Sequence, residues 1–339
     1  MSNKPSPLKL LSIDGGGVRG LASLIIIKHL MKRVNPDNPP KPCEYFDLIG
    51  GTSTGGIIAL MLGRLQMDVQ TCIDKYCELS AAIFELRRSN LDLLRRGKDK
   101  WNLKGKYRSQ ALEKSIRNVV EERLGDSQAK MFDSESSCKV FVCTFTKSFN
   151  TPVLIQSYKT AGNVDTQALL DCKIWEAARA TSAAATFFDP ITIGRQTFVD
   201  GATGNNNPIR QVLDEAKLIW PDAVERGRIQ CLVSVGTGVL SLGDFGGNLK
   251  ELVLTLRRIA TDTEETEKRF YKDHKDLGIG NKYFRFNVDR GLSDVALGAF
   301  ERIDVIETAT ENYLRNDRVK ELVETFVSSK ASMLCTYPS

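Results

Sequence analysis

The stretch Gly51-Thr52-Ser53-Thr54-Gly55-Gly56 lies between two apolar runs, Phe46–Ile49 before it and Ile57–Leu65 after it. The first run has the length of a short buried strand, and the second continues as a helix. A G-x-S-x-G turn between a strand and a helix is the setting of a nucleophile elbow, which presents a serine Oγ at the helix N-terminus. The stretch therefore predicts Ser53 as a nucleophile and a serine acyl hydrolase as the class of enzyme.

A second glycine-rich turn, Asp14–Gly20, occurs earlier in the chain. It follows the apolar run Leu8–Ile13, which indicates a buried strand, and it opens a helix predicted over Leu21–Val34. A row of backbone N–H groups, here those of Gly15–Gly17, can stabilise the oxyanion of an acyl-transfer reaction. The two turns together predict a nucleophile and the hydrogen-bond donors that it needs.

A serine hydroxyl also needs a base, and the sequence offers few histidines for that role. The chain has two, His29 in an apolar helical run and His274 in a highly charged stretch. Asp200 is the better candidate, because it follows a predicted strand (Gln196–Val199) and precedes Gly201. A carboxylate at a strand end lies at the sheet edge where open α/β folds bind ligands. With a pKa near 4 it can act as a base only in a dry site that captures the developing charge.

The order of elements predicts the fold class. Strands are predicted over Lys139–Thr146, Val153–Tyr158 and Ile229–Val235, and helices over Lys106–Leu124 and Lys173–Thr181. Strands that alternate with helices favour a three-layer α/β fold with a mainly parallel sheet. No interdomain linker is evident, so the interpretation is one domain over residues 1–339, with a motif-bearing core at about 8–238 and a helical C-terminal part at about 248–339.

The composition is that of a soluble globular protein. The chain has 339 residues, 42% hydrophobic and 26% charged, with a net charge of +5 that favours anionic surfaces without requiring nucleic acid. No apolar run approaches the roughly 20 residues that span a bilayer. Any membrane contact is therefore expected to be peripheral. The absence of a signal-like start and of C-x-x-C spacing predicts a cytoplasmic protein with reduced thiols. No cofactor or metal site is predicted.

Taken together and in this order, Asp14–Gly20, Gly51–Gly56 and Asp200-Gly201-Ala202 resemble the patatin-like phospholipases. The likeness is strongest to the intracellular fungal type and to its calcium-independent phospholipase relatives. Three further blocks agree: Ala178–Ala184, Asn206-Asn207-Pro208 and Ser234–Gly238. One departure is Ala185, where family members often carry a proline.

The resemblance implies a three-layer α/β/α fold and a metal-free lipid acyl hydrolase of the phospholipase A type. It implies a catalytic dyad in which Ser53 is the nucleophile and Asp200 is the base. Carried over by position, the oxyanion hole comprises Gly15, Gly16, Gly17 and Arg19. Arg19 would support the glycine loop or meet the lipid phosphate, whereas an ordinary salt bridge is the structural alternative. The implied partners are a phospholipid or other lipid ester and a membrane surface.

Three alternatives stay open from the sequence. The order Ser53, Asp200, His274 also fits the triad of an α/β-hydrolase esterase. The pattern Gly15-x-Gly17-x-x-Gly20 fits a dinucleotide fingerprint, which would make the chain a non-catalytic nucleotide-binding or scaffold domain, although the expected acidic residue is not evident. The chain can also be one module of a larger protein or a homo-oligomer.

The segment Phe84–Lys106 is strongly basic and interleaved with leucines and Trp101. One interpretation is a cap or docking surface for anionic lipid. The other is a solvated basic face with a few core anchors.

Overall fold

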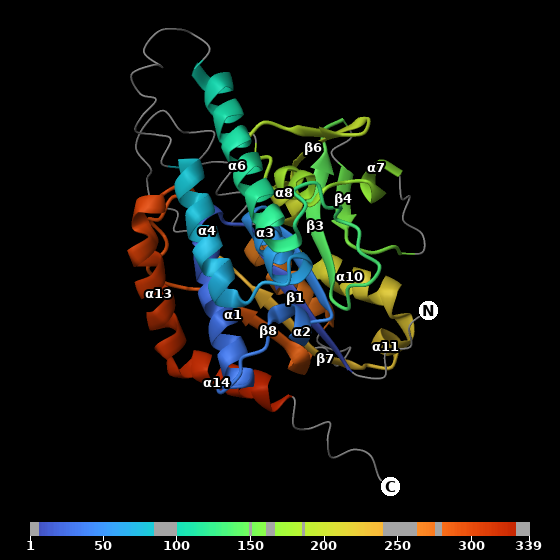
Figure 1. Cartoon of the computed structure of the whole chain (residues 1–339). Coiled ribbons are helices and arrows are strands. Elements are labelled where there is room, and N and C mark those ends of the chain that lie inside the picture. Colours follow the sequence, from blue (N-terminus) through green and yellow to red (C-terminus); the bar gives the residue numbers. More distant parts are fainter. Residues whose placement is uncertain are drawn as a thin grey trace.

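A computed structural model describes residues 7–84, 100–148, 151–160, 167–184, 187–239, 263–274 and 280–329. Within these residues one sheet has the strand order β5-β6-β3-β2-β1-β7-β8, with β4 paired to β3 (Figure 1). The strands are β1 (Leu8–Ile13), β2 (Leu48–Thr52), β3 (Lys139–Thr146), β4 (Thr151–Gln156), β5 (Ile191–Ile193), β6 (Gln196–Asp200), β7 (Ile229–Val235) and β8 (Tyr283–Phe286).

The sheet is parallel in its centre and antiparallel at one side. Strands β3, β2, β1, β7 and β8 run parallel, whereas β4, β5 and β6 pair antiparallel to their neighbours. The predicted α/β class with a mainly parallel sheet is confirmed. The strand predicted over Phe46–Ile49 begins later, at Leu48, because the short helix α2 (Pro42–Tyr45) precedes it, and it continues to Thr52.

Helices cover both faces of the sheet (Figure 1). One face carries α1 (Gly20–Val34), α3 (Thr54–Ala59), α4 (Val69–Phe84), α6 (Lys100–Leu124), α8 (Ile174–Thr181), α13 (Ile303–Arg315) and α14 (Asp317–Ser328). The other face carries α10 (Ile209–Ile219), α11 (Pro221–Glu225) and a helix over 263–274. Two short helices complete the described set, α7 (Gln167–Leu170) and α9 (Ala202–Asn205).

The side chains of β1 alternate between the two cores. Leu11 and Ile13 of β1 face the larger core, whereas Leu8 and Leu10 face the smaller one beneath α10. Side chains of a strand point alternately to opposite faces, so a strand buried on both sides is mostly apolar. Strand β1 has two polar residues, Lys9 and Ser12, and β7 has two, Gln230 and Ser234; the other residues of both strands are apolar.

The C-terminal part contains a strand that the sequence analysis did not predict. Residues 248–339 were expected to be helical, yet β8 pairs in parallel with β7 and extends the sheet. The helices α13 and α14 lie in this part. Residues 248–262 and most of the basic segment Phe84–Lys106 lie outside the described residues.

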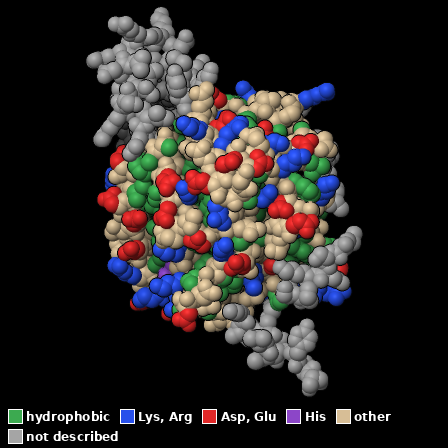
Figure 2. Space-filling model, viewed as in Figure 1, with side chains coloured by type: hydrophobic (Ala, Val, Ile, Leu, Met, Phe, Trp, Pro, Cys, Tyr) green, Lys and Arg blue, Asp and Glu red, His purple; other side chains and the backbone are tan. Residues whose placement is uncertain are grey.

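The face drawn in Figure 2 mixes acidic and basic side chains without a large patch of one sign. Among the described helices none combines the length and apolar content needed to cross a bilayer. The seven cysteines in the described part of the chain are free thiols.

Candidate active site

The turn after β2 has the geometry of a nucleophile elbow. Ser53 joins β2 to α3 with φ 56° and ψ −126°, a conformation that non-glycine residues rarely adopt. The two glycines of the motif permit the close packing around it. A Cβ on Gly51 would lie 2.2 Å from the Gly55 carbonyl oxygen, and one on Gly55 would lie 2.4 Å from the Asp14 carbonyl oxygen. The strained turn therefore presents the Ser53 side chain at the start of α3.

The candidate base contacts the candidate nucleophile directly. The Ser53 hydroxyl donates to Oδ2 of Asp200 at 2.7 Å, and the Ala202 N–H donates to Oδ1 at 2.7 Å. Asp200 is the last residue of β6 and is 5% exposed. Burial raises the pKa of Asp200 to about 7, although both hydrogen bonds act to lower it. A carboxyl group with this pKa can accept a proton near neutral pH.

One strand brings these two residues together from distant parts of the sequence. Residues Lys139–Cys143 of β3 pair with β2, and the rest of the same edge pairs with β6. Thr52 is aligned with Cys143, and Asp200 is aligned with the next residue, Thr144. Strands β2 and β6 therefore end next to each other along β3, with Ser53 directly after one end and Asp200 at the other.

The first glycine loop, Gly15–Gly17, lies beside the elbow. Its three N–H groups differ in whether they already donate a hydrogen bond. The Gly15 N–H already donates to the Asn206 carbonyl at 3.1 Å, so Gly15 does not offer the donor that was expected of it. The Gly16 N–H donates to Thr54 Oγ1 at 3.1 Å. Within the described residues the Gly17 N–H has no acceptor. The available donors are therefore Gly17 and, after a shift of one hydroxyl, Gly16.

Gly17 is fixed by its surroundings. Its φ is +58°, and a Cβ there would lie 2.2 Å from the Leu297 carbonyl oxygen. The Tyr76 hydroxyl of α4 donates to the Gly17 carbonyl. Only glycine meets both the backbone angle and the space. The loop is thus held in one conformation before any substrate binds.

Arg19 is buried next to this loop. Its side chain is 3% exposed, and within the described part of the chain its Nε and Nη1 atoms have no hydrogen-bond partner. Burial lowers its pKa to about 10. The structural alternative of a salt bridge at Arg19 is therefore not seen among the described ion pairs.

The histidine of the alternative triad lies elsewhere. His274 Nδ1 is 2.9 Å from the Phe270 carbonyl oxygen of its own helix, and the ring stacks on Phe270 at 4.3 Å. No contact among the described residues joins it to Ser53, whose hydroxyl is already bonded to Asp200. His29 is half-buried on α1, and burial lowers its pKa. The geometry thus supports a dyad rather than a triad.

The dinucleotide alternative lacks a ribose ligand. In that fold an acidic residue at the end of the second strand binds the ribose hydroxyls. Here the strand beside β1 ends at Thr52, and the next residue is Ser53. The glycine turn is therefore not followed by the group that nucleotide recognition requires.

A buried ion pair anchors the start of the glycine loop, and sequence reasoning missed it. Arg285 of β8 donates from Nη2 to Asp14 Oδ2 at 2.6 Å and from Nη1 to Oδ1 at 3.1 Å. Nη1 also donates to Ser234 Oγ at 2.7 Å. Burial raises the pKa of Asp14, and the Arg285 guanidinium opposes that rise. A signal existed, because a buried carboxylate must be compensated by a cation or by hydrogen bonds, and Asp14 directly follows a buried strand.

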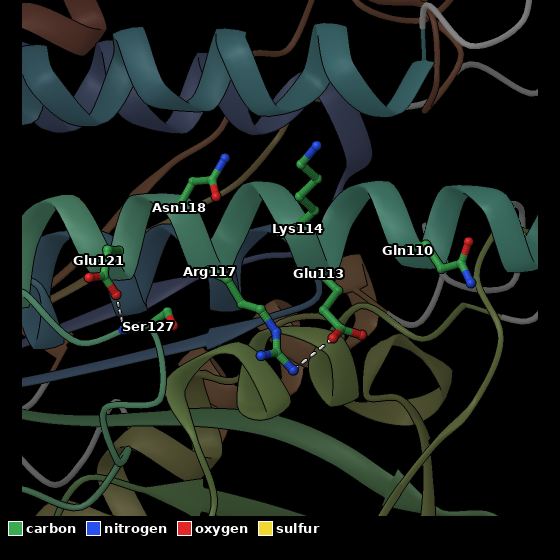
Figure 3. Close-up of a pocket in the computed structure, with 7 residues that line it drawn as sticks. All are labelled: Gln110, Glu113, Lys114, Arg117, Asn118, Glu121 and Ser127. Atoms are coloured by element: carbon green, nitrogen blue, oxygen red, sulfur yellow. Dashed lines mark hydrogen bonds and ion pairs between the residues drawn. The ribbon is translucent and has the colours of Figure 1, made fainter.

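Other features of the structure do not belong to this site. Figure 3 shows residues that line a hollow along α6, among which Glu113 and Arg117 form an ion pair at 2.8 Å. It includes neither Ser53 nor Asp200. Among the described residues no group of three acidic, histidine or cysteine side chains could hold a metal ion.

The α/β fold and the Ser53–Asp200 pair match the fold and the dyad that the family resemblance implies. The sequence model of the patatin-like phospholipases matches residues 11–213, which is more than half of the chain. The chain belongs to the patatin-like phospholipase family.

Named relatives agree with this assignment. Calcium-independent phospholipase A2-gamma of Oryctolagus cuniculus is 29% identical over 342 residues, covering 96% of this chain and 40% of that protein. The Homo sapiens protein of the same name is 30% identical over 292 residues, covering 83% of this chain and 34% of its own length. Phospholipase A I of Arabidopsis thaliana is 29% identical over 279 residues, covering 68% and 21% respectively. The chain thus spans less than half the length of these relatives.

Among solved structures, VipD from Legionella pneumophila aligns with 95% of this chain and 67% of its own, with a TM-score of 0.46 and 11% identity.

Proposed function

We propose that this protein is a metal-free lipid acyl hydrolase of the phospholipase A type, with Ser53 as its nucleophile and Asp200 as its base. The observation that carries the proposal is the 2.7 Å hydrogen bond from the Ser53 hydroxyl to the buried Asp200 carboxylate. Membership of the patatin-like phospholipase family supports the choice of lipid esters as substrates.

The reaction is a double displacement. Asp200 Oδ2 takes the proton of the Ser53 hydroxyl as Oγ attacks the ester carbonyl carbon. The tetrahedral intermediate collapses, the bond to the alcohol oxygen breaks, and the protonated Asp200 returns its proton to the departing alcohol. Water then gives a proton to Asp200 as its oxygen attacks the carbonyl carbon of the acyl-serine. The bond to Ser53 Oγ breaks, Asp200 returns the proton to Oγ, and the fatty acid leaves.

The negative charge on the carbonyl oxygen needs donors that are in place beforehand. The Gly17 N–H is free among the described residues, and the first N–H groups of α3 point outward at its N-terminus. Fixed donors of this kind act without reorganisation during the reaction. The buried Arg19, whose Nε and Nη1 have no hydrogen-bond partner among the described residues, would support the same loop or bind the lipid phosphate.

The proposed setting is a membrane surface in the cytoplasm. The names of the relatives, calcium-independent phospholipase A2-gamma and phospholipase A I, support a phospholipid substrate. Because the relatives are longer, a larger multidomain protein or a homo-oligomer is part of the proposal.

Release of fatty acid from mixed-acyl phosphatidylcholine vesicles in EDTA tests the proposal. We expect free fatty acid and lysophospholipid from the wild type and none from Ser53→Ala, and the acyl chain released identifies the position that is cut. A folded wild type that releases nothing from vesicles or from a soluble ester would contradict the proposal. Release that requires calcium would contradict its metal-free part.

The pH dependence of the reaction follows from the pKa of Asp200. Its folded-state pKa is raised to about 7, and only the ionised carboxylate can accept the serine proton. We expect kcat/KM for a soluble ester to rise about tenfold per pH unit below pH 7 and to level off above it, because kcat/KM reports groups of the free enzyme. The measurement is a pH profile from 4.5 to 9. A flat profile, or a midpoint near the ordinary aspartate value of about 4, would show that another group is the base.

A further inference from the structure

The backbone of the nucleophile is held by a hydroxyl group from another element. Thr181, the last residue of α8, is fully buried and accepts a hydrogen bond from the Ser53 N–H at 2.9 Å. The same hydroxyl donates to the Cys143 carbonyl at 2.7 Å. One hydroxyl can donate once and also accept, so both bonds form together. Thr181 thus links the elbow to β3.

The two hydrogen bonds of Thr181 lie directly beyond the last backbone pairing between β2 and β3. The pairing of β2 with β3 ends at Thr52 opposite Cys143, and Ser53 turns away from the sheet. The Thr181 hydroxyl connects the N–H of Ser53, the first residue after β2, to the Cys143 carbonyl of β3. It therefore takes the place of a direct backbone hydrogen bond between the two segments at the residue where the strained conformation begins.

The approach of α8 to the elbow also depends on a glycine. A Cβ on Gly56 would lie 2.7 Å from Thr181 Oγ1, so any larger residue there would displace the hydroxyl. The residues that follow this helix also hold the backbone of Asp200, because the Ala183 carbonyl accepts a hydrogen bond from the Asp200 N–H at 3.1 Å. One short segment, residues 181–183, therefore fixes the backbones of both members of the pair.

We propose that Thr181 is a positioning residue, whose hydroxyl holds Ser53 in the strained elbow conformation and so aligns its Oγ with Asp200. This rests on the proposed dyad. A residue with φ near +56° costs about 1–3 kcal/mol and persists only while its surroundings enforce it. Removing the hydroxyl leaves the Ser53 N–H without this partner, and the elbow relaxes. Substrate binding does not involve Thr181, so its effect falls on kcat.

The test compares Thr181→Val, which keeps the shape, with Thr181→Ser, which keeps the hydroxyl. We expect kcat for a soluble ester to fall about 10- to 100-fold in Thr181→Val with KM unchanged, since misplacement by about 1 Å costs that much. Thr181→Ser should restore kcat to within about threefold of the wild type, because the two hydrogen bonds can form again.

The matched control is Thr310→Val. Thr310 is also fully buried, but its hydroxyl donates only within α13, to the Ile306 carbonyl. It should keep the wild-type kcat, because the loss of a buried threonine hydroxyl away from the elbow does not move Ser53. Wild-type kcat in a folded Thr181→Val, or equal losses in Thr181→Val and Thr181→Ser, would overturn the inference. Full activity in Ser53→Ala would instead overturn the dyad itself, so the two failures are distinguishable.

Discussion

Each of the single variants Ser53→Ala and Asp200→Asn is expected to lose about 10⁴-fold or more in kcat, and the double variant to lose no more than the worse single one. Residues that act as one unit in a proton transfer show such non-additive losses. The structure places the two in one unit, because the serine proton is directed at Asp200 Oδ2 and at no histidine among the described residues. The measurement is steady-state hydrolysis of a soluble ester by all three variants.

The same Asp200→Asn variant should gain stability while it loses activity. The folded-state pKa of Asp200 is raised to about 7, above the unfolded value near 3.8, so its contribution to stability is full below about pH 4 and is lost as the pH rises through 7. At pH 8 the wild type therefore holds a buried charge that costs a few kcal/mol, and asparagine removes it. Chemical unfolding at pH 8 and pH 4 measures this. A variant that is less stable than the wild type at pH 8, or losses that multiply in the double variant, would contradict the dyad as drawn.

Arg285→Met is expected to have the largest effect on folding. It would leave Asp14, which is 3% exposed at its side chain, as an unpaired buried acid. Breaking one side of a buried pair costs about 3–5 kcal/mol, a large part of the usual 5–15 kcal/mol of a domain. Activity should fall as well, because Asp14 precedes the glycine loop. Denaturant unfolding and ester hydrolysis are the two measurements.

The double variant Asp14→Asn with Arg285→Met is the control for this prediction. Removing both charges removes the uncompensated one, so stability should recover by at least half of the loss. Lys217→Met serves as a comparison at an exposed ion pair with Asp214, where we expect less than about 1 kcal/mol. An Arg285→Met protein as stable as the wild type would show that the pair does not anchor the loop.

Local chemistry explains which parts of this site could be predicted. The G-x-S-x-G turn is specified by neighbours in sequence, since Gly51 and Gly55 must pack against each other around Ser53. Asp200 was found because it ends a strand, and strand ends meet at one edge of a sheet. The fold class could likewise be predicted, because strands alternate with helices along the chain.

Other features depend on contacts that no local pattern encodes. The strand β8 was missed, although the alternating residues Tyr283–Phe286 fit a strand, because helical runs dominate the sequence around them. With β8 unrecognised, Arg285 had no predicted place beside Asp14. The Gly15 N–H donates its hydrogen bond to the carbonyl of Asn206, which is far away in the sequence. Such pairings are set by the packing of distant segments.

The central claim is that Ser53 becomes acylated with Asp200 as its base and without a histidine or a metal. The most direct test is to quench the enzyme in acid during turnover of p-nitrophenyl butyrate in EDTA, and to analyse its peptides by mass spectrometry. We predict a butyryl group on Ser53 in the wild type and in His274→Ala. Turnover that leaves Ser53 unmodified, or acylation that is lost in His274→Ala or in EDTA, would contradict the account.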